Sequence, residues 1–220
     1  MQAALEKDVF FRLVSLSMPV YSYRTIRSAS EGLYKEKGSR FLSFAFPVDN
    51  EAAIRVRLDA LRRQYFDARH HCYAWMLGAD KKLFRAADDG EPNHSAGDPI
   101  LGQIRSNDVT NILIVVVRYF GGIKLGVGGL ISAYREAAAD VLRCATIVEE
   151  EVMVPLRLTY PYEKTPEVMR LIKDYHLSVI AQSYHEKCQL TVRSSLKNME
   201  GALAKIQQLN IPAATIEIIN

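Results

Sequence analysis

The stretch from Arg118 to Leu130, Arg-Tyr-Phe-Gly-Gly-Ile-Lys-Leu-Gly-Val-Gly-Gly-Leu, joins two parts of the sequence with different periodicities. Before it, residues 112–117 form an unbroken apolar run rich in β-branched side chains, which is typical of a buried strand. After it, apolar residues recur at helical spacing as far as Ala145. The stretch therefore predicts a strand, a glycine-rich turn and a helix in that order.

This turn is a candidate anion site because five glycines fall within nine residues: Gly121, Gly122, Gly126, Gly128 and Gly129. Glycine lets a ligand approach the main chain closely, and a helix N-terminus carries unpaired amides and partial positive charge. Arg118 and Lys124 would add full charges beside it. A tight turn with close helix–strand packing and no ligand explains these residues equally well. Their spacing matches neither the P-loop nor the dinucleotide-binding fingerprint.

The composition is ordinary for a globular protein, with 220 residues, 49% hydrophobic and 24% charged. This length suits one large domain or two small ones. The net charge of +3 is mildly basic and does not by itself establish an anionic partner. The three cysteines are scattered within apolar patterns, which favours reduced thiols in a cytoplasmic protein. No apolar run approaches the roughly 20 residues of a membrane span.

The first part of the chain alternates between strand-like and helix-like patterns. Residues 1–17 are interpreted as an N-terminal extension, and Ser30-Glu31-Gly32 as a turn. Strands are expected at 21–27, 40–48, 73–77 and 83–87. Asn50 is expected to cap a helix that follows it, and Asp98 a short helix with Pro99 in its first position.

Glu149-Glu150-Glu151 marks the expected boundary between an N-terminal domain, 18–148, and a C-terminal domain, 149–220. Beyond it, the patterns follow the order β-α-β-β-α-β, which is the ferredoxin-like arrangement. The sequence therefore predicts an α+β protein of two domains.

A loop at 88–99 gathers the four acids Asp88, Asp89, Glu91 and Asp98 with His94, and His70 and His71 lie on another segment. A metal site is conceivable, but the spacing matches neither an EF-hand nor H-E-x-x-H, so no metal or cofactor is expected. A turn in which the acids bond nearby backbone amides is the simpler interpretation. Acid–base catalysis would need partners that the sequence does not show, so an enzyme is disfavoured.

Several short motif blocks follow one another along the first 145 residues: Lys37-Gly-Ser-Arg40-Phe41, Asp67-Ala-Arg69-His70-His71-Cys72 with Ala74-Trp75, Asp88-Asp89-Gly90-Glu91-Pro92, Ser95-Ala96-Gly97 with Pro99, Val117–Ile123, Leu125-Gly126 and Gly128-Gly129-Leu130. In this order they resemble the IMPACT/YigZ family over roughly residues 20–145, and residues 150–220 look like the C-terminal domain of its bacterial members. One departure is His94, where the family pattern usually has glycine.

The resemblance implies an N-terminal ribosomal-protein-type α/β sandwich similar to domain four of elongation factor G. It also implies a C-terminal domain similar to domain five of that factor. Members of the family are linked to translation, and the eukaryotic relatives act as translational regulators through a separate partner-binding domain. These 220 residues leave no room for that domain, so its partner is not carried over. The resemblance transfers no enzymatic reaction.

The leading hypothesis is a cytoplasmic, translation-associated regulator that contacts RNA or the ribosome through the glycine turn with Arg118 and Lys124, helped by Arg40 and Arg69. The alternative is an enzyme or sensor whose small phosphorylated or carboxylated ligand lies between the loops 88–99 and 121–129. A third possibility is a protein partner that pairs with the C-terminal sheet. The motif surface in these hypotheses comprises His70, His71, Asp88, Asp89, Glu91, Ser95 and Gly97.

Overall fold

The structure is a computed structural model that describes residues 20–208 and 215–218. The expected N-terminal extension, 1–17, lies outside these residues. The chain forms two compact units: Tyr23–Glu150 is one, and the described residues up to Ser22 and from Glu151 onward belong to the other. Helices and antiparallel sheets occur in both units, as the sequence predicts.

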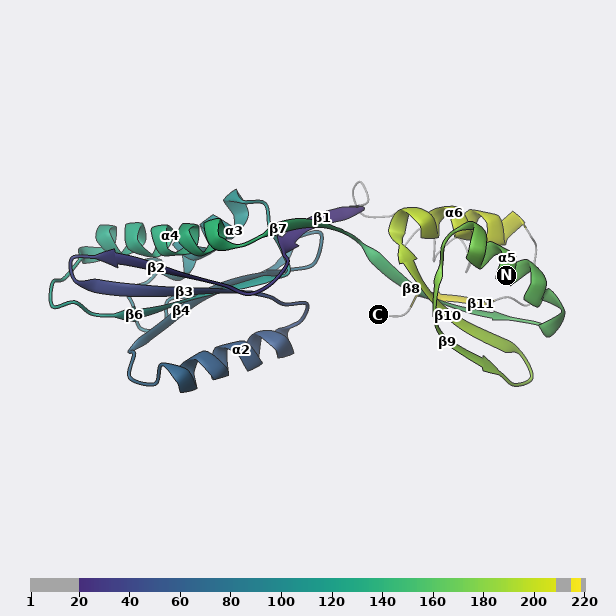
Figure 1. Ribbon diagram of the computed structural model, residues 1–220, viewed down its shortest axis with the longest axis horizontal. Helices are drawn as coiled ribbons and strands as arrows, with labels where there is room; N and C mark the ends of the chain where they lie inside the picture. Colours follow the sequence, from purple (N-terminus) through teal and green to yellow (C-terminus); the bar gives the residue numbers. More distant parts are fainter. Residues whose placement is uncertain (1–19, 209–214, 219–220) are drawn as a thin grey trace. The chain divides into compact units, whose positions relative to one another are not determined.

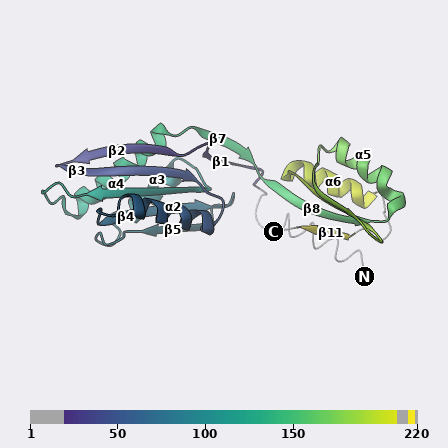
Figure 2. The ribbon, with the colours of Figure 1, turned by 60° about the horizontal axis from the view of Figure 1, so that its bottom comes forward.

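The larger unit is built on a five-stranded antiparallel sheet with the strand order β2-β3-β6-β4-β5 (Figures 1 and 2). A separate two-stranded sheet pairs β1 with β7. The elements of this unit are β1 (Ser22–Ile26), β2 (Ser30–Glu36), β3 (Ser39–Pro47), α2 (Glu51–Gln64), β4 (His70–Leu77), β5 (Leu83–Ala87), α3 (Gly97–Ser106), β6 (Ile112–Tyr119), α4 (Gly126–Cys144) and β7 (Ile147–Glu151).

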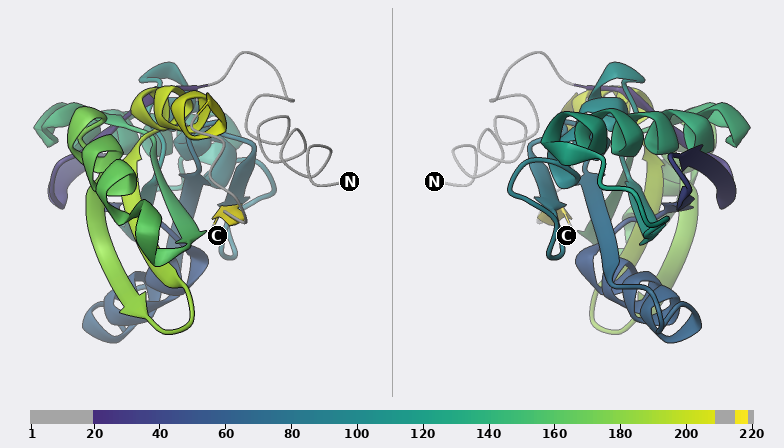
Figure 3. Two further views of the ribbon diagram at one scale, coloured as in Figure 1. Left: turned by 90° about the vertical axis from the view of Figure 1, so that its right-hand side faces the viewer. Right: turned by 90° about the vertical axis from the view of Figure 1, so that its left-hand side faces the viewer.

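Helices cover both faces of this sheet, because alternate side chains of a strand point to opposite faces. Ile112, Ile114 and Val116 of β6 pack with α3 and α4, whereas Leu113 and Val115 pack with α2. The right-hand view of Figure 3 shows α4 on one side of the strands and α2 on the other. The apolar run 112–117 is thus buried on both faces, which explains why it does not alternate.

Local rules predict the start of α2 correctly and the starts of two other elements wrongly. Asn50 caps α2, since its side chain accepts a 2.8 Å hydrogen bond from Ala53 N. Asp98 lies inside α3 instead of capping it, because that helix begins at Gly97. The expected turn at 30–32 is the beginning of β2. Gly32 is needed there for packing, since a Cβ would lie 2.7 Å from Asp140 Oδ2.

In the smaller unit α5 and α6 pack against an antiparallel sheet with the strand order β11-β8-β10-β9. Among the described strands β9 lies at an edge, and it exposes Val179, Ile180 and Tyr184. A protein partner for this sheet stays a prediction. The elements of this unit are β8 (Met153–Tyr160), η1 (Tyr162–Lys164), α5 (Thr165–Asp174), β9 (Ser178–Tyr184), β10 (Cys188–Ser195), α6 (Leu196–Gln208) and β11 (Thr215–Ile218).

Across the described part of the chain, every helix is too short or too polar to span a membrane.

Candidate functional site

Three connections that are distant in the sequence meet at one end of the five-stranded sheet. They are the β2–β3 turn, the α2–β4 connection and the β6–α4 loop, at the left of Figure 1. The strand register explains the meeting, because Arg40 of β3 pairs with Tyr119 of β6, and Arg118 pairs with His70 of β4. The motif blocks of the sequence therefore gather in one place.

Gly121 is needed for the contact between two of these connections. A Cβ on Gly121 would lie 1.9 Å from the carbonyl carbon of Gly38, so any other residue would force the β2–β3 turn away. The Gly121 amide also donates a 3.2 Å hydrogen bond to Ser39 Oγ. Gly122 and Gly126 adopt φ values of 89° and 70°, which favour glycine. These three glycines have structural reasons to be present.

Gly128 has neither of these reasons. It lies in the first turn of α4, its φ is not positive, and a Cβ there would meet no atom of the described residues within 4 Å. Glycine in a helix costs about 1 kcal/mol relative to alanine. The N-cap Leu125 supplies no side-chain hydrogen bond, and the surface from Gly126 to Gly128 is exposed. A glycine at position 128 keeps the amide end of α4 uncovered. At Gly129, by contrast, a Cβ would lie 3.0 Å from Leu125 Cβ.

Exposed basic side chains lie at the same end of the sheet as the N-terminus of α4. Arg40 and Lys35 lie opposite each other on β3 and β2, and Arg40 stacks over the Tyr119 ring at 5.0 Å. Lys37 occupies the β2–β3 turn, Lys124 the β6–α4 loop and Arg69 the residue before β4. Within the described residues, no ion pair involves any of the five. Lys35 and Lys37 are not among the residues predicted from the sequence, although they lie close to Arg40 in the run Lys35-Glu36-Lys37-Gly38-Ser39-Arg40.

Arg118 differs from these exposed cations because it is buried and neutralised. Its Nη1 donates to Glu91 Oε1 at 2.6 Å, and the side chains of the pair are 8% and 4% exposed. The guanidinium also lies 5.5 Å from the centre of the Phe41 ring and 5.8 Å from that of Phe120. Its charge is therefore balanced inside the protein and does not lie free beside the glycine turn.

Two further residues extend this buried pair into a network. The Tyr134 hydroxyl of α4 donates to Glu91 Oε1 at 2.8 Å. The Cys72 thiol donates to the Asp88 carbonyl oxygen at 2.9 Å, and its sulfur lies 3.3 Å from the Tyr134 oxygen. Burial raises the pKa of the Tyr134 hydroxyl and that of the Cys72 thiol, so both stay protonated near neutral pH. The network joins the acidic loop to β4, β6 and α4.

Main-chain amides hold the two aspartates of the acidic loop. Asp88 accepts hydrogen bonds of 2.8–2.9 Å from the amides of His94, Ala96 and Gly97. Burial alone would raise the pKa of Asp88, but these three donors outweigh it and hold the pKa below its usual range. Asp88 thus accepts hydrogen bonds from the first amides of α3, which is the capping role that the sequence predicts for Asp98. Asp89 accepts from His71 N at 2.7 Å.

Ser95 and Gly97 serve this loop in structural ways as well. The buried Ser95 hydroxyl donates to Pro92 O at 2.6 Å, and a Cβ on Gly97 would lie 2.5 Å from Ala87 N. His94, the departure from the family pattern, adopts a φ of 63°, the left-handed conformation that glycine adopts most easily.

The histidines His70 and His71 point to opposite faces of β4, as alternation predicts. His70 Nδ1 lies 2.9 Å from the Asp89 carbonyl oxygen, so this nitrogen is the donor. His71 faces α2 and is 6% exposed, and its Nε2 has no hydrogen-bond partner among the described residues. Burial lowers the pKa of His71, although Asp89 opposes the shift.

A pocket of about 360 Å³ opens at this end of the sheet. Its lining combines polar and aromatic side chains from the α2–β4 connection and the end of β6: Asp67, Ala68, Arg69, His70, Arg118, Tyr119 and Phe120. The Tyr119 hydroxyl donates to Asp67 Oδ1 at 2.7 Å. None of these residues belongs to the loops 88–99 and 121–129, between which the alternative hypothesis places its ligand.

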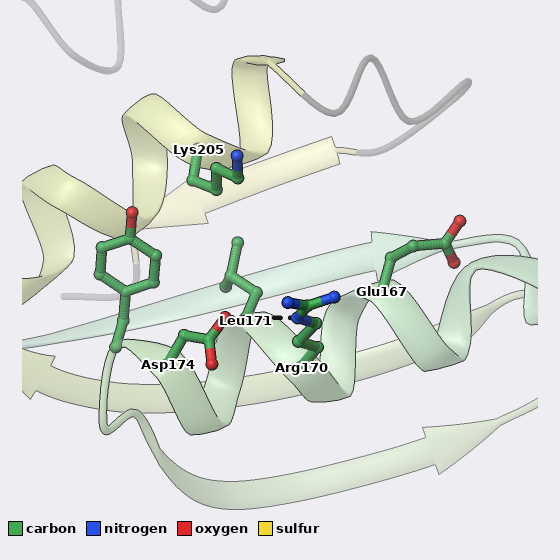
Figure 4. A pocket seen from close by; sticks show the side chains of 6 residues that line it. Glu167, Arg170, Leu171, Asp174 and Lys205 are labelled. Atoms are coloured by element: carbon green, nitrogen blue, oxygen red, sulfur yellow. Dashed lines mark ion pairs between the residues drawn. The ribbon is translucent and has the colours of Figure 1, made fainter.

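A larger pocket, about 640 Å³, lies in the smaller unit beside α5 (Figure 4). Glu167, Arg170 and Asp174 project from α5, and Lys205 projects from α6. Arg170 and Asp174 form an ion pair of 3.7 Å, and Glu167 pairs with Lys164 at 2.8 Å. The charges of this lining balance, so it is a weaker candidate for an anion than the basic end of the larger unit.

Within residues 20–208 and 215–218, no group of three or more His, Cys, Asp or Glu side chains is arranged to hold a metal ion.

The fold and the site define a class of proteins in which a glycine-rich loop and an acidic loop meet at one basic end of an antiparallel sheet. Residues 37–142 match the family model of the Impact N-terminal domain. The chain is 35% identical over 150 residues to the IMPACT family member YigZ of Escherichia coli (strain K12), a match that covers 67% of this chain and 74% of YigZ. It is 32% identical over 166 residues to the IMPACT family member YvyE of Bacillus subtilis (strain 168), with 72% and 76% covered.

A crystal structure of a hypothetical protein is similar over nearly the whole chain. It is 29% identical, with a TM-score of 0.71, and the match covers 91% of this chain and 98% of that one. The chain belongs to the IMPACT/YigZ family, as the motif blocks predict.

Proposed function

We propose that this protein is a cytoplasmic, translation-associated regulator that binds RNA or the ribosome through the basic end of its larger unit. The link to translation rests on membership of the IMPACT/YigZ family, whose members are linked to translation. The observation that carries the RNA contact is the group of exposed cations Lys35, Lys37, Arg40, Arg69 and Lys124.

We also propose finer fold assignments for the two units, with boundaries near residues 18–148 and 149–220. The larger unit is a ribosomal-protein-type fold similar to domain four of elongation factor G. The smaller is ferredoxin-like and similar to domain five. The element order β-α-β-β-α-β and the antiparallel strand order β11-β8-β10-β9 support the second assignment.

Charge explains why this surface suits a nucleic acid backbone. The exposed cations come from the β2–β3 hairpin, the α2–β4 connection and the β6–α4 loop, which meet at one end of the sheet, so they can contact consecutive phosphates. The acids of the neighbouring loop oppose them little: Asp88 accepts three amide hydrogen bonds, and Glu91 is paired with Arg118. The uncapped N-terminus of α4 adds amide donors and the positive end of a helix dipole.

A salt titration of RNA binding tests this proposal. The protein is mixed with a fluorescently labelled single-stranded oligoribonucleotide, and anisotropy gives Kd from about 50 to 200 mM salt. Removing two phosphate contacts, with Lys37→Gln and Lys124→Gln together, should weaken binding and reduce the slope of log K against log salt by about 1.4, roughly 0.7 for each contact. The loss should be similar for all RNA sequences, since phosphates carry no sequence information.

The matched control removes the same charge elsewhere on the larger unit. Arg55→Gln with Lys82→Gln changes two exposed cations, one on α2 and one in the β4–β5 turn at the other end of the sheet. This control should retain the slope of the unmodified protein. An equal loss of RNA affinity in both double variants would show that only net charge matters and would reject the proposed surface. Binding that does not depend on salt would reject it as well.

Gly128 tests the part assigned to the N-terminus of α4. Gly128→Ala should stabilise the helix by about 1 kcal/mol, because its Cβ meets nothing. The same substitution at Gly102, an exposed and unhindered glycine of α3, should stabilise similarly. If RNA approaches the α4 amides, only Gly128→Ala weakens binding. Unchanged RNA affinity in the Gly128 variant would remove α4 from the contact.

A further inference from the structure

The pocket at the basic end has the size and lining of a site for one planar ring system. Its volume of about 360 Å³ is near the lower limit of small-molecule pockets, roughly 300–1,000 Å³. It is formed by residues 67–70 and 118–120, so of the five exposed cations only Arg69 lines it, and the other four lie outside the lining. One part of a ligand could therefore enter the pocket while another part contacts the cations outside it.

Aromatic side chains at the pocket are exposed more than their apolar surface favours. Phe120, part of the lining, is 58% exposed, and Phe66, next to the lining segment, is 83% exposed. The Phe120 ring lies 5.8 Å from the Arg118 guanidinium, so the two already stack at this place. A flat, unsaturated ring would bury Phe120 without displacing any packed side chain.

The polar groups of the lining suit a neutral, hydrogen-bonding ring better than an anion. Asp67 carries a negative charge into the pocket, and the charge of Arg118 is balanced by Glu91. Since His70 Nδ1 faces the Asp89 carbonyl, Nε2 of the neutral ring is an acceptor. Asp67 can accept from an amino group, and Arg69 can donate to a ring carbonyl. Within the part of the chain that the structure describes, the buried Arg118 Nε has no hydrogen-bond partner, so a ligand oxygen could accept from it.

We propose that this pocket receives one unpaired base of a single-stranded RNA, whose adjoining phosphates lie on the surrounding cations. This proposal rests on the proposed function and specifies single-stranded RNA as the form that the protein recognises. The base stacks on Phe120 and presents its edge to Asp67, Arg69 and His70. Lys37, Arg40 and Lys124 contact the backbone. A base within a duplex has its edge paired and its faces stacked, so it does not enter the pocket.

The test compares a single strand with the duplex of the same sequence, and two phenylalanines with each other. Phe120→Ala should weaken binding of the single strand by about 5- to 150-fold, the range expected for the loss of one stacked base. Phe84→Ala is the matched control, because Phe84 is also exposed, at 45%, and stacks under Arg105 at 4.5 Å far from the pocket. The control should bind normally. Unmodified protein should prefer the single strand to the duplex.

A fluorescent base reports occupation of the pocket directly. A strand carrying 2-aminopurine should change its fluorescence on binding to the unmodified protein and to Phe84→Ala, but not to Phe120→Ala. Loss of single-strand affinity below twofold in Phe120→Ala overturns the subsite, and so does equal binding of the duplex. In either case salt-dependent RNA binding would still support the proposed function. If no RNA binds at low salt, both fail, and stabilisation by a mononucleotide alone would indicate a small-molecule site instead.

Discussion

Replacing Glu91 with glutamine tests whether the buried network organises the basic end of the sheet. Glu91 accepts from Arg118 at 2.6 Å and from Tyr134 at 2.8 Å, and its side chain is 4% exposed. Glutamine keeps the size and one acceptor oxygen but removes the charge that balances the guanidinium. The substitution therefore leaves a buried cation without a counter-charge.

The size of the effect follows from the burial of both partners. Removing one member of a buried ion pair costs about 3–5 kcal/mol, because the remaining charge stays desolvated and cannot reach water. With a urea dependence of about 2 kcal/mol per molar, that loss lowers the unfolding midpoint of the larger unit by about 2 M. The loss is a large fraction of the roughly 5–15 kcal/mol that holds a typical domain.

Tryptophan fluorescence measures this unit alone, since the only tryptophan of the chain, Trp75, packs in its core against α2. Asp59→Asn is the control, because Asp59 and Arg62 form an exposed pair of 3.9 Å on α2 and its loss should cost about 0.5 kcal/mol or less. Removing both charges, with Glu91→Leu and Arg118→Met, should cost less than the sum of the two single losses. A midpoint shift below about 0.5 M for Glu91→Gln, or strictly additive losses, would refute the reasoning.

Two further predictions use the same urea titration. His94 adopts a φ of 63°, so His94→Gly should be more stable than His94→Ala by about 1 kcal/mol; both lose the imidazole, and equal midpoints would contradict the strain. Burial lowers the pKa of His71 in the folded state, so the unfolded chain binds more protons just below its own pKa of about 6.5. Stability should therefore fall as the pH drops from 7.5 to 5.5, and His71→Gln should reduce this slope; an unchanged slope would assign the dependence to other groups.

Patterns that depend on neighbouring residues predicted the structure well. The apolar run 112–117 followed by glycines and a helical repeat indicated β6, its loop and α4, all of which the structure contains. The Asn50 cap depends only on a side chain and an amide three residues later. Local geometry decides such features, so the sequence is sufficient.

Features that depend on contacts across the fold were missed or misplaced. Asp98 has the right position for a cap of α3, yet Asp88 reaches the same amides from a loop that folds back. Gly32 is typical of a turn, yet its reason is the close approach of α4. In both cases the deciding partner is brought near by tertiary structure, which a local rule does not consider.

The burial of Arg118 could have been predicted from the alternation of side chains along β6. Ile112, Ile114 and Val116 alternate toward the α3–α4 face of β6, and the same alternation places Arg118 on that buried face. A buried arginine needs a counter-charge, and the acidic loop is the nearest source of one in the motif blocks. Strand alternation therefore could have predicted a neutralised arginine, although the sequence does not identify Glu91 as its partner.

The charged residues at this end of the sheet divide into two groups with different roles. Arg118, Glu91 and the aspartates of the acidic loop are bonded to one another or to main-chain amides, and they fasten the loop to β4, β6 and α4. The cations of the β2–β3 turn and the β6–α4 loop have no such partners among the described residues and face solvent. Arg118 also lines the pocket, so the buried, bonded charges fix the shape of the site. The exposed cations supply electrostatic affinity for RNA. Substitutions in the first group should therefore lower stability and binding together, whereas substitutions in the second should lower binding alone.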